Sequence, residues 1–166
     1  MPILACALLS MILVAQGVQQ APANAPSAGH LAPAGEPGER LAVSGTVVTA
    51  DGAPVRGASI YVYQTDSEGY YGVKPASDNR NPRLKLFLRS GADGRWSFET
   101  IRPGSYPGSR VPGHIHFEVA APGYADRIFE IVFEGDPFIT AQMRSDPAFS
   151  VRRIESGRVS DRIVMR

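Results

Sequence analysis

Two histidines separated by one residue are the best candidates for chemistry in this chain. His114 and His116 lie in the apolar run 113–117. Because side chains alternate between the two faces of a strand, both imidazoles should project from the same side of a sheet. Tyr106 lies just upstream, in the Pro/Gly turn of residues 103–107. Two imidazoles on one face can bind one metal ion, so the spacing predicts a metal site with a tyrosine beside it. Taken singly, these residues also fit hydrogen-bonded core histidines and a packed turn aromatic.

Short β-rich runs separated by turn residues should position these side chains. They cover residues 41–49, 58–64, 84–88, 95–100, 113–120, 127–133 and 159–165. The pattern predicts an all-β chain whose residues 41–166 form a single β-sandwich domain with long loops. A helix is expected at most over residues 139–149. The polar segment 73–83 is expected to be a loop of the kind that carries binding groups.

Size, charge and cysteine content exclude several classes of protein. A chain of 166 residues allows one domain with a modest core. The net charge is +1 and the basic residues are scattered, so no nucleic-acid partner is expected. The single cysteine, Cys6, excludes an intramolecular disulfide and a cysteine-rich metal site.

The first forty residues are predicted to lie outside this domain. Residues 3–14 form an apolar run that is short for a membrane span and typical of a signal peptide. We therefore expect residues 1–17 to be a signal peptide and the protein to be exported, periplasmic or secreted, with no stable membrane span. A lipid anchor at Cys6 ranks second and a buried core helix third. Residues 18–40, rich in Ala, Pro and Gly, are expected to be a flexible linker, which makes His30 a poor ligand.

Several segments together resemble a known enzyme family. Residues 100–107 (TIRPGSYP), 114–117 (HIHF) and 133–137 (FEGDP) resemble the core signature of the intradiol ring-cleavage dioxygenases, the catechol and protocatechuate dioxygenases. Upstream, residues 45–58 resemble the opening hairpin of that family, and residues 63–71 (YQTDSEGYY) resemble its segment ending in Gly-x-Tyr. The resemblance covers roughly residues 41–137, almost all of the predicted domain.

The resemblance implies a mononuclear non-haem Fe(III) centre whose ligands are Tyr71, Tyr106, His114 and His116. Phenolate is a hard anionic donor that suits ferric iron, whereas zinc favours His, Cys or carboxylate. The implied reaction is cleavage of a catechol-type aromatic diol by O2 between its two hydroxyl-bearing carbons, giving a cis,cis-muconate-type dicarboxylic acid. By analogy Tyr71 would be the base for the substrate, and Arg110 would stabilise negative charge on the ring.

The chain departs from the family pattern around the substrate. Arg110 stands four residues before His114, whereas the family arginine usually stands three before its histidine. Glu130 occupies a position where a glutamine commonly helps to place the substrate. A carboxylate there should disfavour a dianionic ligand unless it is protonated or paired, with Arg110 as the candidate partner. Gly108 replaces a bulky residue, so the site is expected to be more open.

Two other functions remain open on sequence grounds. Residues 45–58, 93–98 and 103–106 also resemble exported, non-catalytic β-sandwich modules of the carboxypeptidase-regulatory type. Such modules do not account for His114 and His116 together with Tyr71, so the dioxygenase is favoured. A degenerate dioxygenase that binds iron or aromatics without turnover is the third alternative. An exposed sandwich edge would also suit a homodimer.

Overall fold

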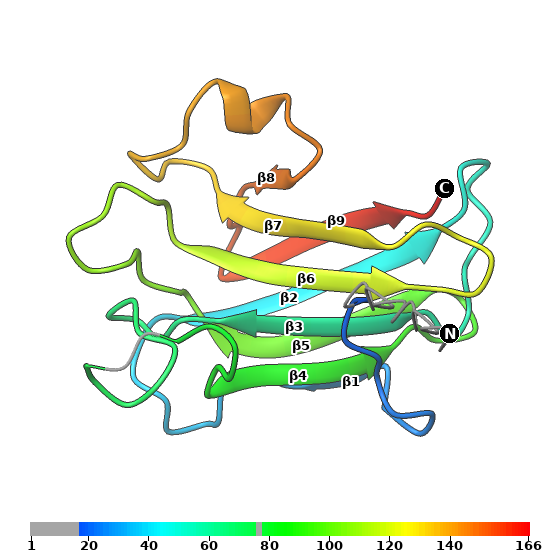
Figure 1. The fold of residues 1–166 in the computed structure, drawn as a ribbon, viewed down its shortest axis with the longest axis horizontal. Coiled ribbons are helices and arrows are strands. Elements are labelled where there is room, and N and C mark those ends of the chain that lie inside the picture. The colour runs from blue at the N-terminus through cyan, green and yellow to red at the C-terminus, as the bar shows by residue number, and fades with distance from the viewer. Residues whose placement is uncertain (1–16, 76–77) are drawn as a thin grey trace, which may run out of the picture.

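The predicted β-sandwich is confirmed. The computed structural model describes residues 17–75 and 78–166, which form two facing sheets (Figure 1). One sheet has the strand order β1-β5-β2-β9 and the other β4-β3-β6-β7-β8. The strands are β1 (Ala28–His30), β2 (Arg40–Val48), β3 (Ser59–Gln64), β4 (Leu84–Arg89), β5 (Arg95–Ile101), β6 (His114–Ala120), β7 (Arg127–Phe133), β8 (Phe149–Arg152) and β9 (Arg158–Val164).

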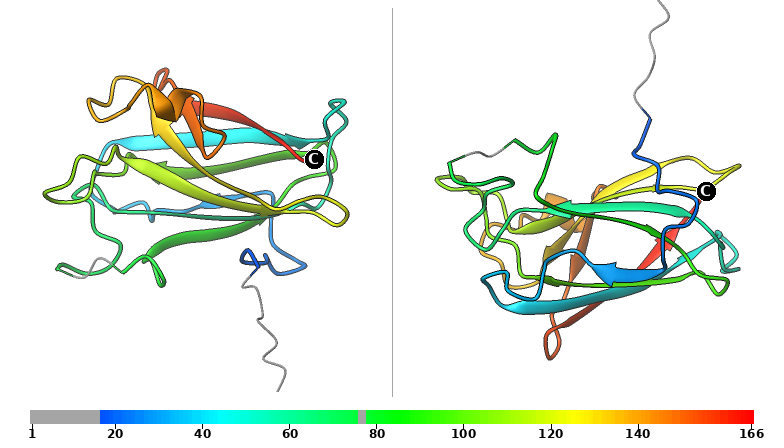
Figure 2. Two further views of the ribbon diagram at one scale, coloured as in Figure 1. Left: turned by 45° about the horizontal axis from the view of Figure 1, so that its top comes forward. Right: turned by 90° about the horizontal axis from the view of Figure 1, so that it is seen from below.

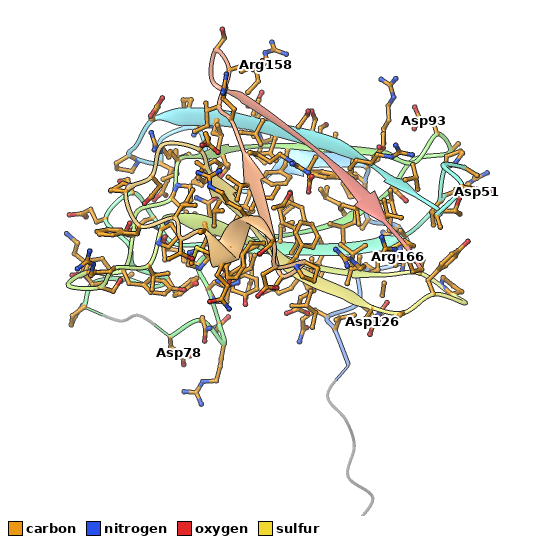
Figure 3. The ribbon with its side chains drawn as sticks, turned by 90° about the horizontal axis from the view of Figure 1, so that it is seen from above. Asp51, Asp78, Asp93, Asp126, Arg158 and Arg166 are labelled. Atoms are coloured by element: carbon orange, nitrogen blue, oxygen red, sulfur yellow. The ribbon has the colours of Figure 1, made fainter. Side chains whose placement is uncertain are left out.

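The core lies between the two sheets and is rich in aromatic residues. Trp96 and Phe98 on β5 pack on Phe117 of β6, with ring centroids 5.4 and 6.1 Å apart, and Phe117 stacks on Phe129 of β7. Figure 3 shows the side chains filling the space between the layers. Each buried aromatic of this kind stabilises the fold by about 1.5–3 kcal/mol. This core fixes β6 in the middle of its sheet, between β3 and β7.

The predicted flexible linker over residues 18–40 is wrong. Its residues 28–30 form β1, which pairs in parallel with β5, and Leu31 is buried in the core. Nearer the N-terminus, the backbone N–H of Ala21 donates to Ser59 Oγ at 2.7 Å. The segment therefore passes from the five-stranded sheet to the four-stranded one (Figure 2). Backbone pairing to an open sheet edge requires no apolar periodicity, so the composition of residues 18–40 gave no indication of this strand. Residues 1–16 of the predicted signal peptide lie outside the described residues.

The helix expected over residues 139–149 is also corrected. Only one 3-10 turn, η1 (Gln142–Arg144), forms there, and Pro147 disfavours helical geometry at the residue before it. The next residues form β8, a strand that the sequence reading missed, which pairs in parallel with β7. Within the ranges that the structure describes, no helix is long and apolar enough to cross a membrane.

Candidate metal centre

The two histidines project from the same face of β6, as their spacing predicted. Their Nε2 atoms lie 3.0 Å apart, and His114 is only 4% exposed. His116 is paired with Tyr63 on β3 and with Glu130 on β7. Because β6 is hydrogen-bonded on both sides, the two imidazoles are held on a rigid support.

Two tyrosines from different loops bring their hydroxyls to these imidazoles. Tyr71 Oη lies 2.6 Å from Tyr106 Oη and 2.6 Å from His116 Nε2. Tyr106 Oη lies 3.0 Å from His114 Nε2. All four predicted metal ligands are therefore brought together, and they are called the Tyr/His cluster below. The loops that carry the tyrosines gather at the end of the sandwich where β3 ends and β6 begins (Figure 1).

Glycines let the two tyrosine loops approach backbone to backbone. Gly69 has a φ of +89°, and a Cβ there would overlap the carbonyl oxygen of Ser105. A Cβ on Gly104 would lie only 2.5 Å from the carbonyl oxygen of Ser67. Both contacts are closer than any side chain allows. The position of Tyr71 relative to Tyr106 therefore depends on glycine at these two sites.

Asp66 closes the turn that leads to Tyr71. Its Oδ1 accepts hydrogen bonds from the backbone N–H groups of Glu68 and Tyr70, both at 3.0 Å. Its carbonyl oxygen accepts a 2.8 Å bond from the N–H of Gly104, which ties this turn to the Tyr106 loop. Asp66 lay inside the motif that sequence reasoning singled out, but no role was assigned to it there.

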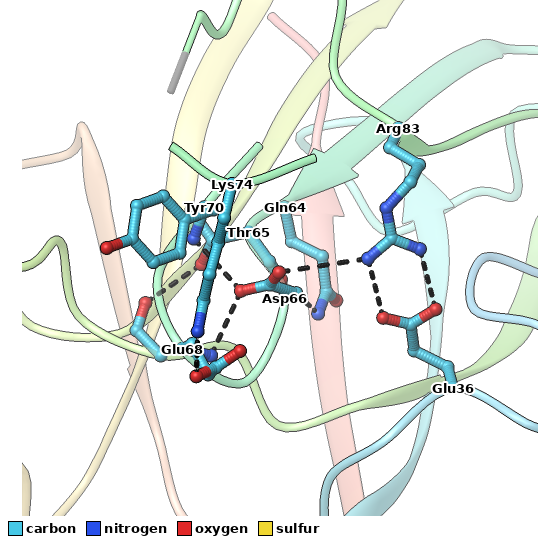
Figure 4. Close-up of polar contacts among 9 residues, drawn as sticks. Glu36, Gln64, Thr65, Asp66, Glu68, Tyr70, Lys74 and Arg83 are labelled. Carbon is cyan, nitrogen blue, oxygen red and sulfur yellow. Dashed lines mark hydrogen bonds and ion pairs between the residues drawn. The ribbon is translucent and has the colours of Figure 1, made fainter. Parts of the chain in front are cut away.

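An ion pair between Arg83 and Glu36 supports this turn through Asp66 (Figure 4). Arg83 Nη2 lies 3.8 Å from Asp66 Oδ2, and the Arg83 guanidinium donates to both oxygens of Glu36 at 2.6 and 2.7 Å. The backbone N–H of Arg83 donates to the carbonyl oxygen of Tyr71 at 2.7 Å. Sequence reasoning missed Glu36 because it lies in the segment read as a linker. Its side chain is 7% exposed.

Burial disfavours charge on both tyrosines and on His116. Burial raises the pKa of Tyr71, and the hydrogen bond to Tyr106 adds to the rise. Burial also raises the pKa of Tyr106. Burial, with repulsion from His114, lowers the pKa of His116 to about 3. The two Nε2 atoms and the two phenol oxygens crowd together at 2.6–3.0 Å, an arrangement of donor atoms that a bound cation would stabilise.

The donor set fits ferric iron. Ligand atoms bound at about 2 Å to one ion lie roughly 3 Å from one another, and the contacts in the Tyr/His cluster are 2.6–3.0 Å. His114 Nδ1 is 2.7 Å from the carbonyl oxygen of Pro112, so the proton belongs on Nδ1 and Nε2 is free to bind. Two phenolates and two imidazoles are hard and borderline donors, as Fe(III) prefers.

Glu130 lies beside the cluster and offers a second possible donor. Its carboxyl, with His114 and His116, forms a group whose ligand atoms lie within 4.8 Å of one another. The nearest contact is 3.3 Å from Glu130 Oε1 to Nδ1 of His116, the nitrogen on the side of the ring away from Tyr71. Because His116 is neutral, this contact is not an ion pair. A carboxyl at Nδ1 is better placed to orient the imidazole than to replace a tyrosine as ligand.

Burial also raises the pKa of the Glu130 carboxyl, the neighbouring His114 opposing this only in part. A raised pKa favours the uncharged form of this carboxyl, and only the ionised form would repel a dianionic ligand.

The structure does not bring Arg110 to the cluster. Arg110 is exposed, and within residues 17–75 and 78–166 its side chain makes no hydrogen bond or ion pair, so the suggested pairing with Glu130 is not seen. Gly108, on the same loop, has a φ of +72°, and a Cβ there would meet open space.

Comparisons with known proteins agree with the geometry. A family model described as "Dioxygenase" matches residues 18–154. Hydroxyquinol 1,2-dioxygenase of Rhizobium sp. (strain MTP-10005) is 32% identical over 131 residues, 69% of this chain and 43% of the relative. The protocatechuate 3,4-dioxygenase beta chain of Burkholderia cepacia is 35% identical over 127 residues, 69% of this chain and 52% of the relative. The chain thus spans about half the length of these relatives.

Solved structures share the fold. The dioxygenase domain of a dioxygenase carbohydrate-binding protein fusion from Streptomyces sp. SirexAA-E superposes with a TM-score of 0.63 at 25% identity, covering 89% of this chain and 95% of that one. Catechol 1,2-dioxygenase from Acinetobacter sp. ADP1 gives a TM-score of 0.66 at 19% identity, covering 86% of this chain and 59% of that one. Because the family model spans most of the folded residues, the chain belongs to the intradiol ring-cleavage dioxygenase family.

Proposed function

We propose that this protein uses Fe(III) to cleave a catechol-type aromatic diol with O2, giving a cis,cis-muconate-type dicarboxylic acid. The observation that supports it best is the convergence of Tyr71 Oη, Tyr106 Oη and the two Nε2 atoms of His114 and His116. Fe(III) held by these four groups would supply the Lewis acidity that draws electron density from a bound diolate ring and so activates it toward O2.

The protein's own groups would handle the substrate protons. Tyr71 Oη lies 2.6 Å from both Tyr106 Oη and His116 Nε2, within the distance of a proton transfer to either group. As a phenolate, Tyr71 is our candidate for the base that accepts a proton from the diol. His114 keeps its own proton on Nδ1, held by the Pro112 carbonyl oxygen, and stays a fixed ligand.

Arg110 is our candidate for stabilising negative charge on the ring, a role that requires its exposed side chain to turn toward the cluster. Glu130 is the candidate for orienting His116 and for limiting the charge that the site accepts. The two roles are separable because the side chains lie on different elements, Arg110 in the loop before β6 and Glu130 on β7.

Incubation of the iron-loaded full chain with catechol and O2 tests the proposal. The expected result is consumption of one O2 per catechol and formation of a muconate-type dicarboxylic acid, identified by mass spectrometry. Stoichiometric iron with no product from catechol, hydroxyquinol or protocatechuate would contradict turnover and favour a degenerate binder. Absence of both iron and product would favour a non-catalytic β-sandwich module.

A further inference from the structure

A row of stacked aromatic rings crosses the outer face of the five-stranded sheet beside the Tyr/His cluster. Tyr61 and Tyr63 share one face of β3, and Phe87 on β4 is the cross-strand partner of Tyr61. The Tyr61 ring centroid lies 5.3 Å from that of Tyr63 and 4.6 Å from that of Phe87, and both pairs are stacked. We call Tyr61, Tyr63 and Phe87 the aromatic row.

The aromatic row is continuous with the metal centre. Tyr63 is the cross-strand partner of His116, and the two rings stack at 4.3 Å with an interplanar angle of 12°. The Tyr63 ring also lies 6.0 Å from that of Tyr71. A ligand at the Tyr/His cluster would therefore lie beside the Tyr63 ring, which is also part of the aromatic row.

The same three residues line a hollow in the surface of about 620 Å³. Gln19 and Glu118 line it as well, joined by a 2.7 Å hydrogen bond from the backbone N–H of Gln19 to Glu118 Oε2. A volume of this size suits a small organic ligand. Tyr63 and Phe87 are half-buried, so part of each ring remains available for contact.

The hollow is chemically suited to a flat ring with polar substituents. Neutral aromatic side chains bind other rings by offset stacking or edge contact. Lys85, which also lines the hollow, offers an ammonium donor for a hydroxyl or carboxylate on such a ring.

We propose that the aromatic row is a subsite for the second aromatic ring of a multi-ring catechol whose diol ring lies at the Tyr/His cluster. The proposal rests on the proposed function for the diol end alone. Tyr63 joins the two halves, since it stacks on the ligand His116 and lines the hollow. A single-ring catechol would fill the metal site and leave the hollow empty, so the structure favours biaryl or larger phenolic substrates.

Comparison of the steady-state kinetics of two substrates tests the subsite. The iron-loaded full chain would be assayed with catechol and with 4-phenylcatechol, and the two kcat/KM values compared. We expect about a tenfold preference for 4-phenylcatechol, carried mainly by KM, corresponding to the contact of one added ring. Phe87→Ala should remove most of the preference, and Phe87→Tyr should keep it. Ile128→Ala is the matched control: Ile128 is 67% exposed on β7, does not line the hollow, and should leave the preference unchanged. An equal preference in wild type and Phe87→Ala would overturn the subsite.

A second measurement separates the subsite from catalysis. Calorimetry on the iron-free full chain would use biphenyl-4-carboxylate, which has no diol and cannot chelate iron as a catechol does. Binding that weakens about tenfold in Phe87→Ala and returns in Phe87→Tyr supports the subsite, even if no catechol is cleaved and the proposed function fails. No binding overturns the subsite, even if catechol is cleaved. The subsite would also be overturned if the chain formed a concentration-dependent dimer that excludes the probe and dissociates in Phe87→Ala. That result would assign the aromatic row to contact with a second copy of the chain.

Discussion

The two histidines and the two tyrosines of the cluster are held by different devices. His114 and His116 lie on a strand that is hydrogen-bonded on both sides, so the alternation of a β-strand alone places their rings together. Tyr71 and Tyr106 lie on two loops 35 residues apart in sequence, held in contact by glycines and by Asp66. The histidine half is therefore a local property of the chain, and the tyrosine half is a property of the whole fold.

Substitution of the glycine that locks the loops should break the tyrosine half and leave the histidine half intact. Gly69→Ala places a Cβ against the Ser105 carbonyl oxygen at a φ of +89°. We expect the free energy of unfolding to fall by about 2–4 kcal/mol and iron binding to be lost. Denaturant titration measures the first effect and an iron assay the second. Gly123→Ala is the control, because Gly123 has a similar φ of +84° with nothing near its Cβ, and should cost about 1 kcal/mol. Equal costs at the two sites would show that the loops do not need the close approach.

Glu130→Gln sharpens the comparison on the histidine side. The Glu130 carboxyl lies 3.3 Å from His116 Nδ1 and is 28% exposed. Glutamine keeps an amide oxygen for that contact and removes any negative charge. We therefore expect iron binding to survive and the affinity for a catecholate to rise several-fold, measured by titrating catechol into the iron-loaded protein and following its visible spectrum. Unchanged affinity would place Glu130 outside the pocket, and loss of iron would make it a ligand.

Glu36→Gln should give the smallest effect and tests the outer support of the tyrosine loops. The hydrogen bond from Arg83 holds the pKa of Glu36 below its usual value of 4.5. Since the folded-state pKa is lowered, Glu36 stabilises the protein above pH 4.5, and this contribution is lost as the pH falls through the folded-state value. The variant should thus be less stable than wild type at pH 7, and the difference should shrink as the pH falls below 4.5, as seen by thermal unfolding. A stability difference between wild type and variant that does not change with pH would show that the charge of Glu36 is not its cause. Glu39→Gln, at an exposed glutamate, is the control.

The same contrast explains which features could be predicted from sequence. Strand alternation is local, so the seven expected strands and the shared face of His114 and His116 followed from the pattern of residue types. The contact of Tyr71 with Tyr106 has no local signal, and only the family resemblance suggested it. β1 and Glu36 were missed because backbone pairing and a long-range ion pair carry no hydrophobic period. Arg110 was assigned by analogy with the family, although its spacing from His114 departs from the family pattern, and sequence position within a loop does not fix where a side chain lies.

Iron content and the visible spectrum of the full chain test the central claim most directly, with Tyr71→Phe and Tyr106→Phe measured beside wild type. The four-residue cluster predicts one Fe(III) per chain and a visible tyrosinate-to-iron charge-transfer band. Each single substitution should weaken or shift the band, and the double substitution should abolish it. Stoichiometric iron with an unchanged spectrum in the double variant would contradict the account and assign the metal to His114, His116 and Glu130 instead.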